Sequence, residues 1–372
     1  MISGTPSLFV WSLSEPRPKG LESFVEQYAR AYEYYGSGKA ALHDGMRMLT
    51  DPGENVLVPS YLPDAVVEPF RELGLEARYY AVTDDLAPDL DDLQPRIDDD
   101  TAAVMSVNYF GFPQPGLDAI ADLAADHDCY HVDDNAHSVL SVDDGTLLGT
   151  RGHLGIASLW KLLPVPNGAL LYLNDESIAR RFEPSGLAGT NARIDSDDWL
   201  FVLKSFAVDV LSTNTVVKQS VDAFVSTNGS VRAASEPFAR YEAAKAPMSK
   251  LAAHVVADAD PEAIRAARRR NYRCWRRLFE PRGDVEILYP ELPAGICPQV
   301  FPVRADDPDR LLTELARCGV DGAHTWPRLS ETVLEDPALE TAAALSAAVV
   351  VLPVHQHIVT DDIEAVGRRL DR

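Results

Sequence analysis

The sequence predicts an α/β protein with one large, mostly parallel sheet followed by a smaller α+β domain. Short apolar segments alternate with amphipathic segments through the first half of the chain, at the spacing of β-α-β units. The C-terminal part mixes strands and helices without that regular alternation. At 372 residues the chain exceeds a single small core, so we expect two domains, over residues 1–257 and 258–372.

In the first domain, predicted strands and helices alternate after an irregular start. Residues 1–20 hold three prolines and little periodicity, which predicts an irregular N-terminal arm. Apolar residues at helical spacing predict a helix over 21–35, and the turn 36–38 opens another helix at Lys39. The units that follow predict strands at 55–59, 77–82, 102–108, 129–133, 156–159 and 169–173, and helices at 65–73, 90–97 and 117–127.

The remaining chain is more helical. We expect long helical stretches over 195–255 and a basic helix over 258–280 that leads into the second domain. The last part predicts strands at 285–288, 299–303 and 347–352, with helices at 307–318 and from 360 onward. Ligands bind to parallel sheets at the carboxyl ends of the strands, so functional residues are sought there.

Composition excludes several classes of function. The net charge of −23 repels nucleic acid and anionic membranes. An acidic surface fits either a cationic partner or a high-salt milieu, and the spread of acids along the whole chain favours high salt. The chain has no run of 18 apolar residues and no basic-then-apolar leader, so we expect no membrane span and a cytoplasmic location. The four cysteines lack metal-binding spacing, which predicts free thiols and no metal site.

Lys161 is the first candidate for chemistry. It is one of only seven lysines, and it follows a predicted strand within the apolar stretch Ser158-Leu159-Trp160-Lys161-Leu162. A lysine that attacks a carbonyl must lose its proton, and an apolar setting favours that loss. The alternative is a lysine at an ordinary strand-to-loop junction whose ammonium extends into water.

Asp134 and His137 lie just beyond the predicted strand at 129–133. A carboxylate at the pyridine nitrogen of pyridoxal phosphate (PLP) keeps that nitrogen protonated, and His137 could bond the phenolic oxygen of the same ring. With a Schiff-base lysine, these are the groups that PLP chemistry needs most. Each residue also has a structural alternative, since Asp134 could cap a helix or turn and His137 could be a core histidine.

A phosphate could bind at the glycine-containing turn before the helix that opens at Lys39. Ser37, Gly38 and Lys39 form this turn, where backbone N–H groups and the helix dipole favour an anion. Ser158 could donate its hydroxyl to the same phosphate. Such turns are common, so the signal is weak when taken alone.

Six segments, in order, resemble motifs of the DegT/DnrJ/StrS group of PLP-dependent aminotransferases, which act mostly on nucleotide sugars. The resemblance covers most of the chain and implies PLP fold type I, the aspartate aminotransferase-like fold. The segments are the turn 36–42, the strand unit 55–61, the loop 107–111, the segment 132–137, the lysine stretch 158–168 and the closing stretch 350–363.

The resemblance also implies roles for individual residues. Lys161 would carry PLP as a Schiff base, Asp134 would pair with the pyridine nitrogen, and His137 stands where the family has Gln or His. The other implied cofactor contacts are Ser158, Ser37, Gly38 and Lys39 at the phosphate, Tyr61 in place of an aromatic over the ring, and Asn191 from the other subunit, within Gly189-Thr190-Asn191-Ala192-Arg193. A residue shared in this way implies a homodimer with composite active sites.

The expected activity is amino transfer to a keto sugar, nucleotide-linked, with glutamate or glutamine as amino donor. The lysine at 161 argues against relatives that replace it and run dehydrations. Several positions depart from the family pattern, including a short gap between Ser158 and Lys161, and Pro63 where many members have an aromatic. Two alternatives therefore stay open, another PLP reaction (dehydratase, lyase or keto-acid transaminase) and a non-catalytic binding or regulatory homologue.

Overall fold

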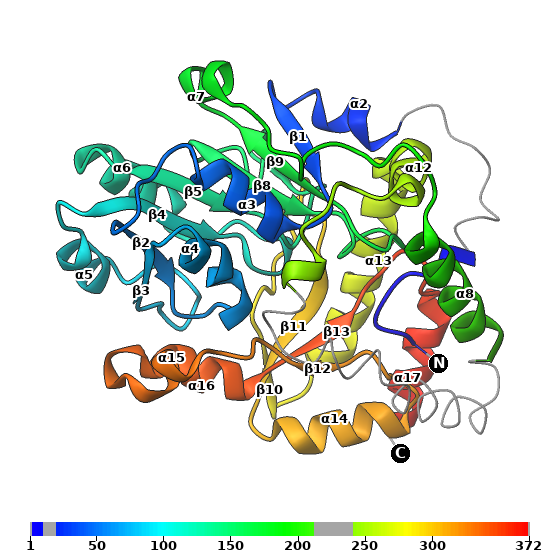
Figure 1. The fold of residues 1–372 in the computed structure, drawn as a ribbon. Coiled ribbons are helices and arrows are strands. Elements are labelled where there is room, and N and C mark those ends of the chain that lie inside the picture. The colour runs from blue at the N-terminus through cyan, green and yellow to red at the C-terminus, as the bar shows by residue number, and fades with distance from the viewer. Residues whose placement is uncertain (1, 10–19, 212–240, 371–372) are drawn as a thin grey trace.

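Figure 1 shows the computed structural model, which describes residues 2–9, 20–211 and 241–370. Seven strands form the large sheet in the order β1-β9-β8-β5-β4-β2-β3. Their bounds are β1 Tyr32–Tyr35, β2 Asn55–Pro59, β3 Glu76–Tyr80, β4 Thr101–Val107, β5 Tyr130–Asp134, β8 Leu154–Ser158 and β9 Ala169–Leu173. A separate hairpin joins β6 Val142–Asp143 to β7 Thr146–Leu147.

The large sheet is mostly parallel, as predicted. Strands β3, β2, β4, β5 and β8 run parallel to their neighbours, and β9 and β1 complete one edge in the antiparallel sense. All residues of β2, β8 and β9 are buried, as in a sheet covered on both faces. Successive residues of β9 enter two different cores, with Leu171 in one and Leu170 and Tyr172 in the other.

Helices connect and cover these strands. α3 packs on β8 and β9, and α6, which joins β4 to β5, packs on both of these strands. The helices are α2 Leu21–Val25, α3 Gly38–Met46, α4 Glu68–Glu72, α5 Leu90–Leu93, α6 Leu117–Asp126, α7 Glu176–Arg181, α8 Ser196–Leu211 and α12 Lys250–Asp258, with 3-10 turns η1 Asp64–Val67, η2 Gln94–Arg96 and η3 Tyr109–Gly111.

The C-terminal part has its own antiparallel sheet, in the order β10-β11-β13-β12 (lower part of Figure 1). Its long helix α13 packs on β10, β11 and α17. The elements are β10 Val285–Ile287, β11 Val300–Ala305, β12 His324–Thr325, β13 Val349–Pro353, α13 Pro261–Phe279, α14 Pro308–Arg317, α15 Glu331–Glu335, η4 Pro337–Leu339, α16 Glu340–Ala348 and α17 Thr360–Leu370. The predicted small α+β unit is therefore present.

One expected element is wrong. The helix predicted over 21–35 ends at Val25, and residues 32–35 form strand β1, which pairs with β9. The run Tyr32-Glu33-Tyr34-Tyr35 is rich in aromatics, which favour a pleated surface, and a partner strand outweighs the helical spacing upstream. Of the helical stretch expected over 195–255, the structure shows α8 and α12; residues 212–240 lie outside the described part, as do residues 10–19 of the expected arm.

No helix within the described ranges combines the length and the apolar character that a membrane span requires. The four cysteines are all buried free thiols, as expected from their spacing. No group of three or more His, Cys, Asp or Glu side chains in the described part could hold a metal ion.

Candidate active site

The carboxyl ends of neighbouring parallel strands bring the predicted residues to one edge of the large sheet. β5 ends at Asp134 and β8 ends at Ser158, and these two strands pair directly. Lys161 follows three residues after Ser158, in the turn between β8 and β9. The N-terminus of α3, which packs on β8, reaches the same edge at Gly38. This is the edge at which parallel α/β sheets bind ligands.

Two adjacent aspartates at the end of β5 have opposite environments, because successive side chains of a strand point to opposite faces. The Asp133 carboxylate accepts hydrogen bonds from Asn108 Nδ2 at 2.6 Å, Gly149 N at 2.9 Å and Arg151 N at 3.2 Å. The Asp134 carboxylate accepts one backbone bond through Oδ1, from Ala136 N at 2.7 Å. Asp133 is therefore held by the fold, while Asp134 keeps acceptor capacity for another group.

Asp134 and Lys161 influence each other's protonation. Burial raises the pKa of Asp134 to about 6, and the nearby Lys161 charge limits that rise. Burial lowers the pKa of Lys161 to about 8, and the Asp134 carboxylate opposes the lowering. The lysine is partly buried beside Trp160, whose indole is 48% exposed. The arrangement gives an amine that loses its proton near neutral pH, as a carbonyl-attacking lysine must.

His137 has a fixed orientation. Its Nδ1 accepts the backbone N–H of Phe110 at 2.7 Å, so in the neutral ring the proton is on Nε2. Burial lowers the pKa of His137 well below its usual value, and the Lys161 charge lowers it further. The ring stacks on Phe110 and contacts the edge of Trp326. His137 is thus a neutral residue with an oriented Nε2–H donor.

The N-terminus of α3 has the features of a phosphate cradle. Ser37 caps the helix, with its Oγ accepting the Ala40 N–H at 3.1 Å. Within the described chain, the N–H groups of Gly38 and Lys39 have no acceptor, and they lie at the positive end of the helix dipole. A methyl group added to Gly38 would lie 3.2 Å from Ser158 Oγ, so the hydroxyl faces the same space.

Gly36 joins this turn to the lysine turn. Its N–H donates to Ala246 O at 2.8 Å, and its carbonyl accepts the Gly168 N–H at 2.7 Å. A Cβ at position 36 would lie 2.5 Å from Ala246 O, so only glycine fits there. The candidate phosphate turn at 36–38 and the loop that follows Lys161 are therefore fixed relative to each other by backbone hydrogen bonds.

Three predicted side chains have other partners. The Ser37 hydroxyl donates to Ala244 O at 3.0 Å in addition to capping α3. The Lys39 ammonium forms an ion pair with Glu68 at 2.5 Å, so its backbone is the part that faces the cradle. The Tyr61 hydroxyl donates to Trp326 O at 2.7 Å, and the side chain is fully buried. Tyr61 is therefore packed behind the site rather than open to it.

Asn191 lies in the segment beside α12, where its N–H donates to Met248 O at 2.8 Å. The expected contact of this side chain is with another subunit, so its role stays a prediction.

Sequence reasoning missed two groups of residues near the site. Trp326 forms an aromatic wall with Tyr61, Tyr109, Phe110 and His137, and no local pattern in the sequence marks it. Arg268 donates to the carbonyl oxygens of the lysine turn from α13.

A signal for Arg268 did exist in the sequence. Ile264, Arg268, Asn271 and Trp275 follow helical spacing and are all buried, so the arginine lies on the inward stripe of a helix that was expected only to be basic.

The residues present fit PLP on charge and on donor type. A carboxylate with free acceptor capacity suits the protonated pyridine nitrogen, and the free N–H groups of α3 with Ser158 Oγ suit a phosphate. Lys161 supplies an amine with a lowered pKa, and His137 supplies a donor. The buried hydroxyl of Tyr109 has no partner in the described structure, and the charge of Asp134 contributes to raising its pKa, so it is a further polar group beside the site.

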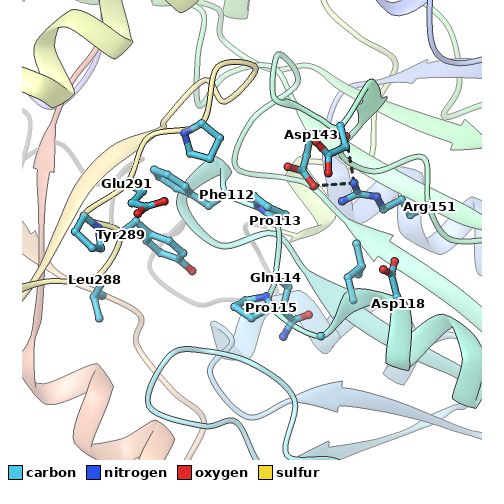
Figure 2. Close-up of a pocket in the computed structure, with 15 residues that line it drawn as sticks. Phe112, Pro113, Gln114, Pro115, Asp118, Asp143, Arg151, Leu288, Tyr289 and Glu291 are labelled. Carbon is cyan, nitrogen blue, oxygen red and sulfur yellow. Dashed lines mark hydrogen bonds and ion pairs between the residues drawn. The ribbon is translucent and has the colours of Figure 1, made fainter.

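A cavity of about 490 Å³ lies elsewhere, between the loop after η3 and the segment after β10 (Figure 2). Its walls include Phe112 and Tyr289, whose rings stack at 4.3 Å, and the ion-paired side chains of Asp143 and Arg151. None of the predicted cofactor residues lines it. The arrangement of reactive groups, rather than this cavity, therefore defines the candidate active site.

Comparison with known proteins gives a family match over nearly the whole chain. The model of the DegT/DnrJ/EryC1/StrS aminotransferase family matches residues 15–371. Two curated relatives are similar over shorter stretches. A GDP-4-keto-6-deoxy-D-mannose 3-dehydratase of Yersinia pseudotuberculosis is 31% identical over 151 residues, which is 36% of this chain and 38% of that protein. A GDP-perosamine synthase of Vibrio cholerae is 25% identical over 171 residues, which is 44% of this chain and 46% of that protein.

The matched stretches thus span less than half the length of either curated relative. Similarity in fold extends further. The crystal structure of the sugar aminotransferase CalS13 from Micromonospora echinospora superposes with a TM-score of 0.67 at 17% identity, covering 99% of this chain and 97% of that chain.

Proposed function

We propose that this chain, which belongs to the DegT/DnrJ/EryC1/StrS aminotransferase family, transfers an amino group to a nucleotide-linked keto sugar. The family match confirms the predicted family and its aminotransferase class, and the likeness to CalS13 confirms the predicted fold. PLP is the cofactor of this family, and a similar dehydratase from E coli was solved with bound hydrated PLP. The substrate, the amino donor and the roles of individual residues are the parts that we propose here.

The proposal depends on two observations: the different hydrogen bonding of the two aspartates at the end of β5, and the position of Lys161 near one of them. Asp133 is fully bonded within the fold, whereas Asp134 keeps a free acceptor within electrostatic reach of an amine whose pKa is about 8. A degenerate binding protein has no need for a buried carboxylate and a partly buried lysine that shift each other's pKa. The pair therefore favours catalysis over the non-catalytic alternative.

Each residue has a separate task in this proposal. When bound, PLP supplies the electron sink that stabilises charge on the substrate carbon. The Asp134 carboxylate would accept the pyridinium N–H, and Gly38, Lys39 and Ser158 would bind the phosphate through two backbone N–H groups and a hydroxyl. His137 would donate Nε2–H to the phenolic oxygen. Lys161 would hold the cofactor through its amine and, when that amine is free and neutral, would act as the base at the substrate carbon.

Support for a nucleotide-linked substrate comes from the relatives. Both curated relatives are named for reactions or products of GDP-linked sugars, and both match this chain at low identity. Glutamate or glutamine is proposed as the amino donor. The test is a pair of half-reactions with the PLP-loaded enzyme: the donor alone should abolish the visible cofactor band, and a GDP-linked keto sugar should restore it. If small keto acids restore the visible cofactor band and no nucleotide-linked keto sugar does, the proposed substrate class is wrong.

The active enzyme is proposed to be a homodimer, in which Asn191 of one subunit reaches the phosphate in the other. Near Asn191 in the sequence, Trp199, Leu200 and Leu203 of α8 are 60%, 49% and 63% exposed, an unusual surface for a helix in water.

We further propose that the two sheets belong to separate domains, over residues 1–257 and 258–372. We also propose that the enzyme acts in the cytoplasm, which fractionation of the source cells would test.

Subunit mixing tests the shared site. Lys161→Ala and Asn191→Ala proteins are each expected to be inactive, and a dimer of one of each has one intact site. Co-refolding equal amounts should restore about a quarter of the wild-type activity, because half of randomly formed dimers are mixed. If the mixture stays inactive while mixed dimers form, Asn191 does not act across the interface.

A further inference from the structure

The turn that carries Lys161 is held from the second domain by a buried arginine. Arg268 on α13 is 1% exposed. Its Nη2 donates to Leu162 O at 3.2 Å and, at the long distance of 3.5 Å, to Lys161 O. Its Nη1 donates to Pro298 O at 3.2 Å and Gln299 O at 3.0 Å, just before β11. One guanidinium thus joins the lysine turn to the edge of the small sheet.

Gln356, in the segment after β13, completes this contact. Its Oε1 accepts Arg268 Nε at 3.1 Å, and its Nε2 donates to Leu162 O at 2.9 Å. The Leu162 carbonyl therefore accepts from two side chains of the C-terminal part. A planar guanidinium with five donors in a fixed fork can hold several carbonyls at once, which the single ammonium of lysine cannot do in the same geometry.

Arg268 forms no ion pair with any carboxylate among the described residues; each of its acceptors is a carbonyl oxygen of the backbone or of Gln356. Burial lowers its pKa to about 10. A buried charge without a counter-ion is costly, and well-packed apolar residues often stabilise such a position as well or better. We therefore attribute the presence of Arg268 to the carbonyl groups that it binds, and not to a net gain in the stability of the fold.

We propose that Arg268 and Gln356 are positioning residues that fix the Lys161 turn against the second domain, so that the lysine amine stays directed towards Asp134. The proposal rests on the proposed function only for the task of Lys161. The order of the turn itself is a property of this chain and can be measured without the cofactor.

Arg269, the next residue of α13, provides a matched control. It is also largely buried, at 9% exposure, and it also donates to backbone carbonyls. Its acceptors are Ile296 O at 2.8 Å, Leu292 O at 3.2 Å and Pro293 O, all in the loop before β11. Removing Arg269 therefore costs a similar set of bonds without touching the lysine turn.

The experiment is amide hydrogen exchange of the protein without PLP, in Arg268→Met, Gln356→Met and Arg269→Met variants. Residues 159–168 contain protected amides, since Leu159 donates to Gly168 O and Leu163 donates to Leu159 O. Exchange in this segment should be about tenfold faster in Arg268→Met, faster also in Gln356→Met, and unchanged in Arg269→Met, in which 292–296 loosens instead. Arg268→Lys should restore only part of the protection.

Equal exchange of residues 159–168 in Arg268→Met and Arg269→Met would overturn the proposal, and so would normal exchange in Gln356→Met if Arg268→Met does not fold. A second measurement is the rate at which added PLP produces the borohydride-sensitive visible band, which should fall about tenfold in Arg268→Met and not in Arg269→Met. If the wild-type protein never produces that band, the proposed function fails, while the exchange comparison still decides the role of Arg268.

Discussion

At the scale of single residues, the two adjacent aspartates at the end of β5 have different roles: Asp133 is bonded within the fold, and Asp134 is left available for a ligand. The sequence marked Asp133 and Asp134 together and selected Asp134 by resemblance; the hydrogen bonds show the difference physically, with several donors on one carboxylate and one on the other. Lys161 and His137 were also predicted, because scarcity and position marked them. Trp326 was not predicted, because its partners are distant in the sequence. Arg268 was not predicted either: helical spacing indicated its place on the inward face of α13, but the carbonyls that it binds are distant in the sequence.

The two aspartates predict opposite mutational effects. Asp133→Asn places an amide donor opposite Gly149 N–H or Arg151 N–H, and the free energy of unfolding should fall by about 2–4 kcal/mol. Asp134→Asn should not destabilise the protein without PLP, but should weaken PLP binding at least tenfold. Denaturant unfolding and PLP titration check both. Equal loss of stability in the two variants would contradict the assignment.

The pH dependence of Asp134 follows from the direction of its shift. Its folded-state pKa of about 6 lies above its usual 3.8, so the charged form is disfavoured in the folded state. Its contribution to the stability of the PLP-free protein is greatest below pH 3.8 and is lost as the pH rises through 6. Asp134→Asn should remove that component from the stability profile.

The lowered pKa of Lys161 determines how the rate of PLP binding should depend on pH. With a pKa of about 8 instead of 10.5, about 300-fold more of the amine is neutral at pH 7. The rate of band formation should rise with pH and level off above about 8, whereas a free alkylamine continues to rise to above pH 10. Stopped-flow absorbance measures this rate. A profile like that of the free amine would mean that burial does not act on Lys161.

At the scale of elements, the apolar runs and the turn residues that interrupt them predicted most strands of the large sheet. β2 and β9 were predicted at their observed bounds, because strands of a sheet covered on both faces are short apolar runs between turns. β1 was missed because the helical spacing upstream continues into its aromatic residues, and the strand depends on its pairing with β9. The helix α15 was not predicted, because its five residues are too few to show a helical period.

The capping of α3 gives a prediction at this scale. Ser37 bonds the Ala40 N–H and Ala244 O, so Ser37→Ala removes the cap of the helix that is proposed to bind the phosphate. Stability should fall by about 1 kcal/mol, and PLP affinity should fall several-fold because the N–H groups of Gly38 and Lys39 are less ordered. Ser37→Thr, which retains the oxygen, should behave nearly as wild type. Thermal unfolding and PLP titration of both variants measure this.

At the scale of the whole molecule, the change of sequence pattern near residue 258 predicted the layout of two sheets that the structure shows. The net charge of −23 predicts salt-dependent stability, since self-repulsion weakens as the screening length falls from about 10 Å at 0.1 M salt to about 3 Å at 1 M. The unfolding temperature should therefore rise between 0.1 and 2 M KCl. A flat or falling temperature would remove the high-salt interpretation.

The most direct test of the central claim is to identify the lysine that binds PLP. The protein is incubated with PLP, reduced with borohydride, digested and analysed by mass spectrometry. We expect a stoichiometric adduct on Lys161 and none in Lys161→Ala. The other six lysines are internal competitors, and Lys39 is the most informative because it lies at the proposed phosphate turn. An adduct spread over several lysines, or placed on Lys39 with Lys161 unmodified, would show that Lys161 is not the PLP-binding residue.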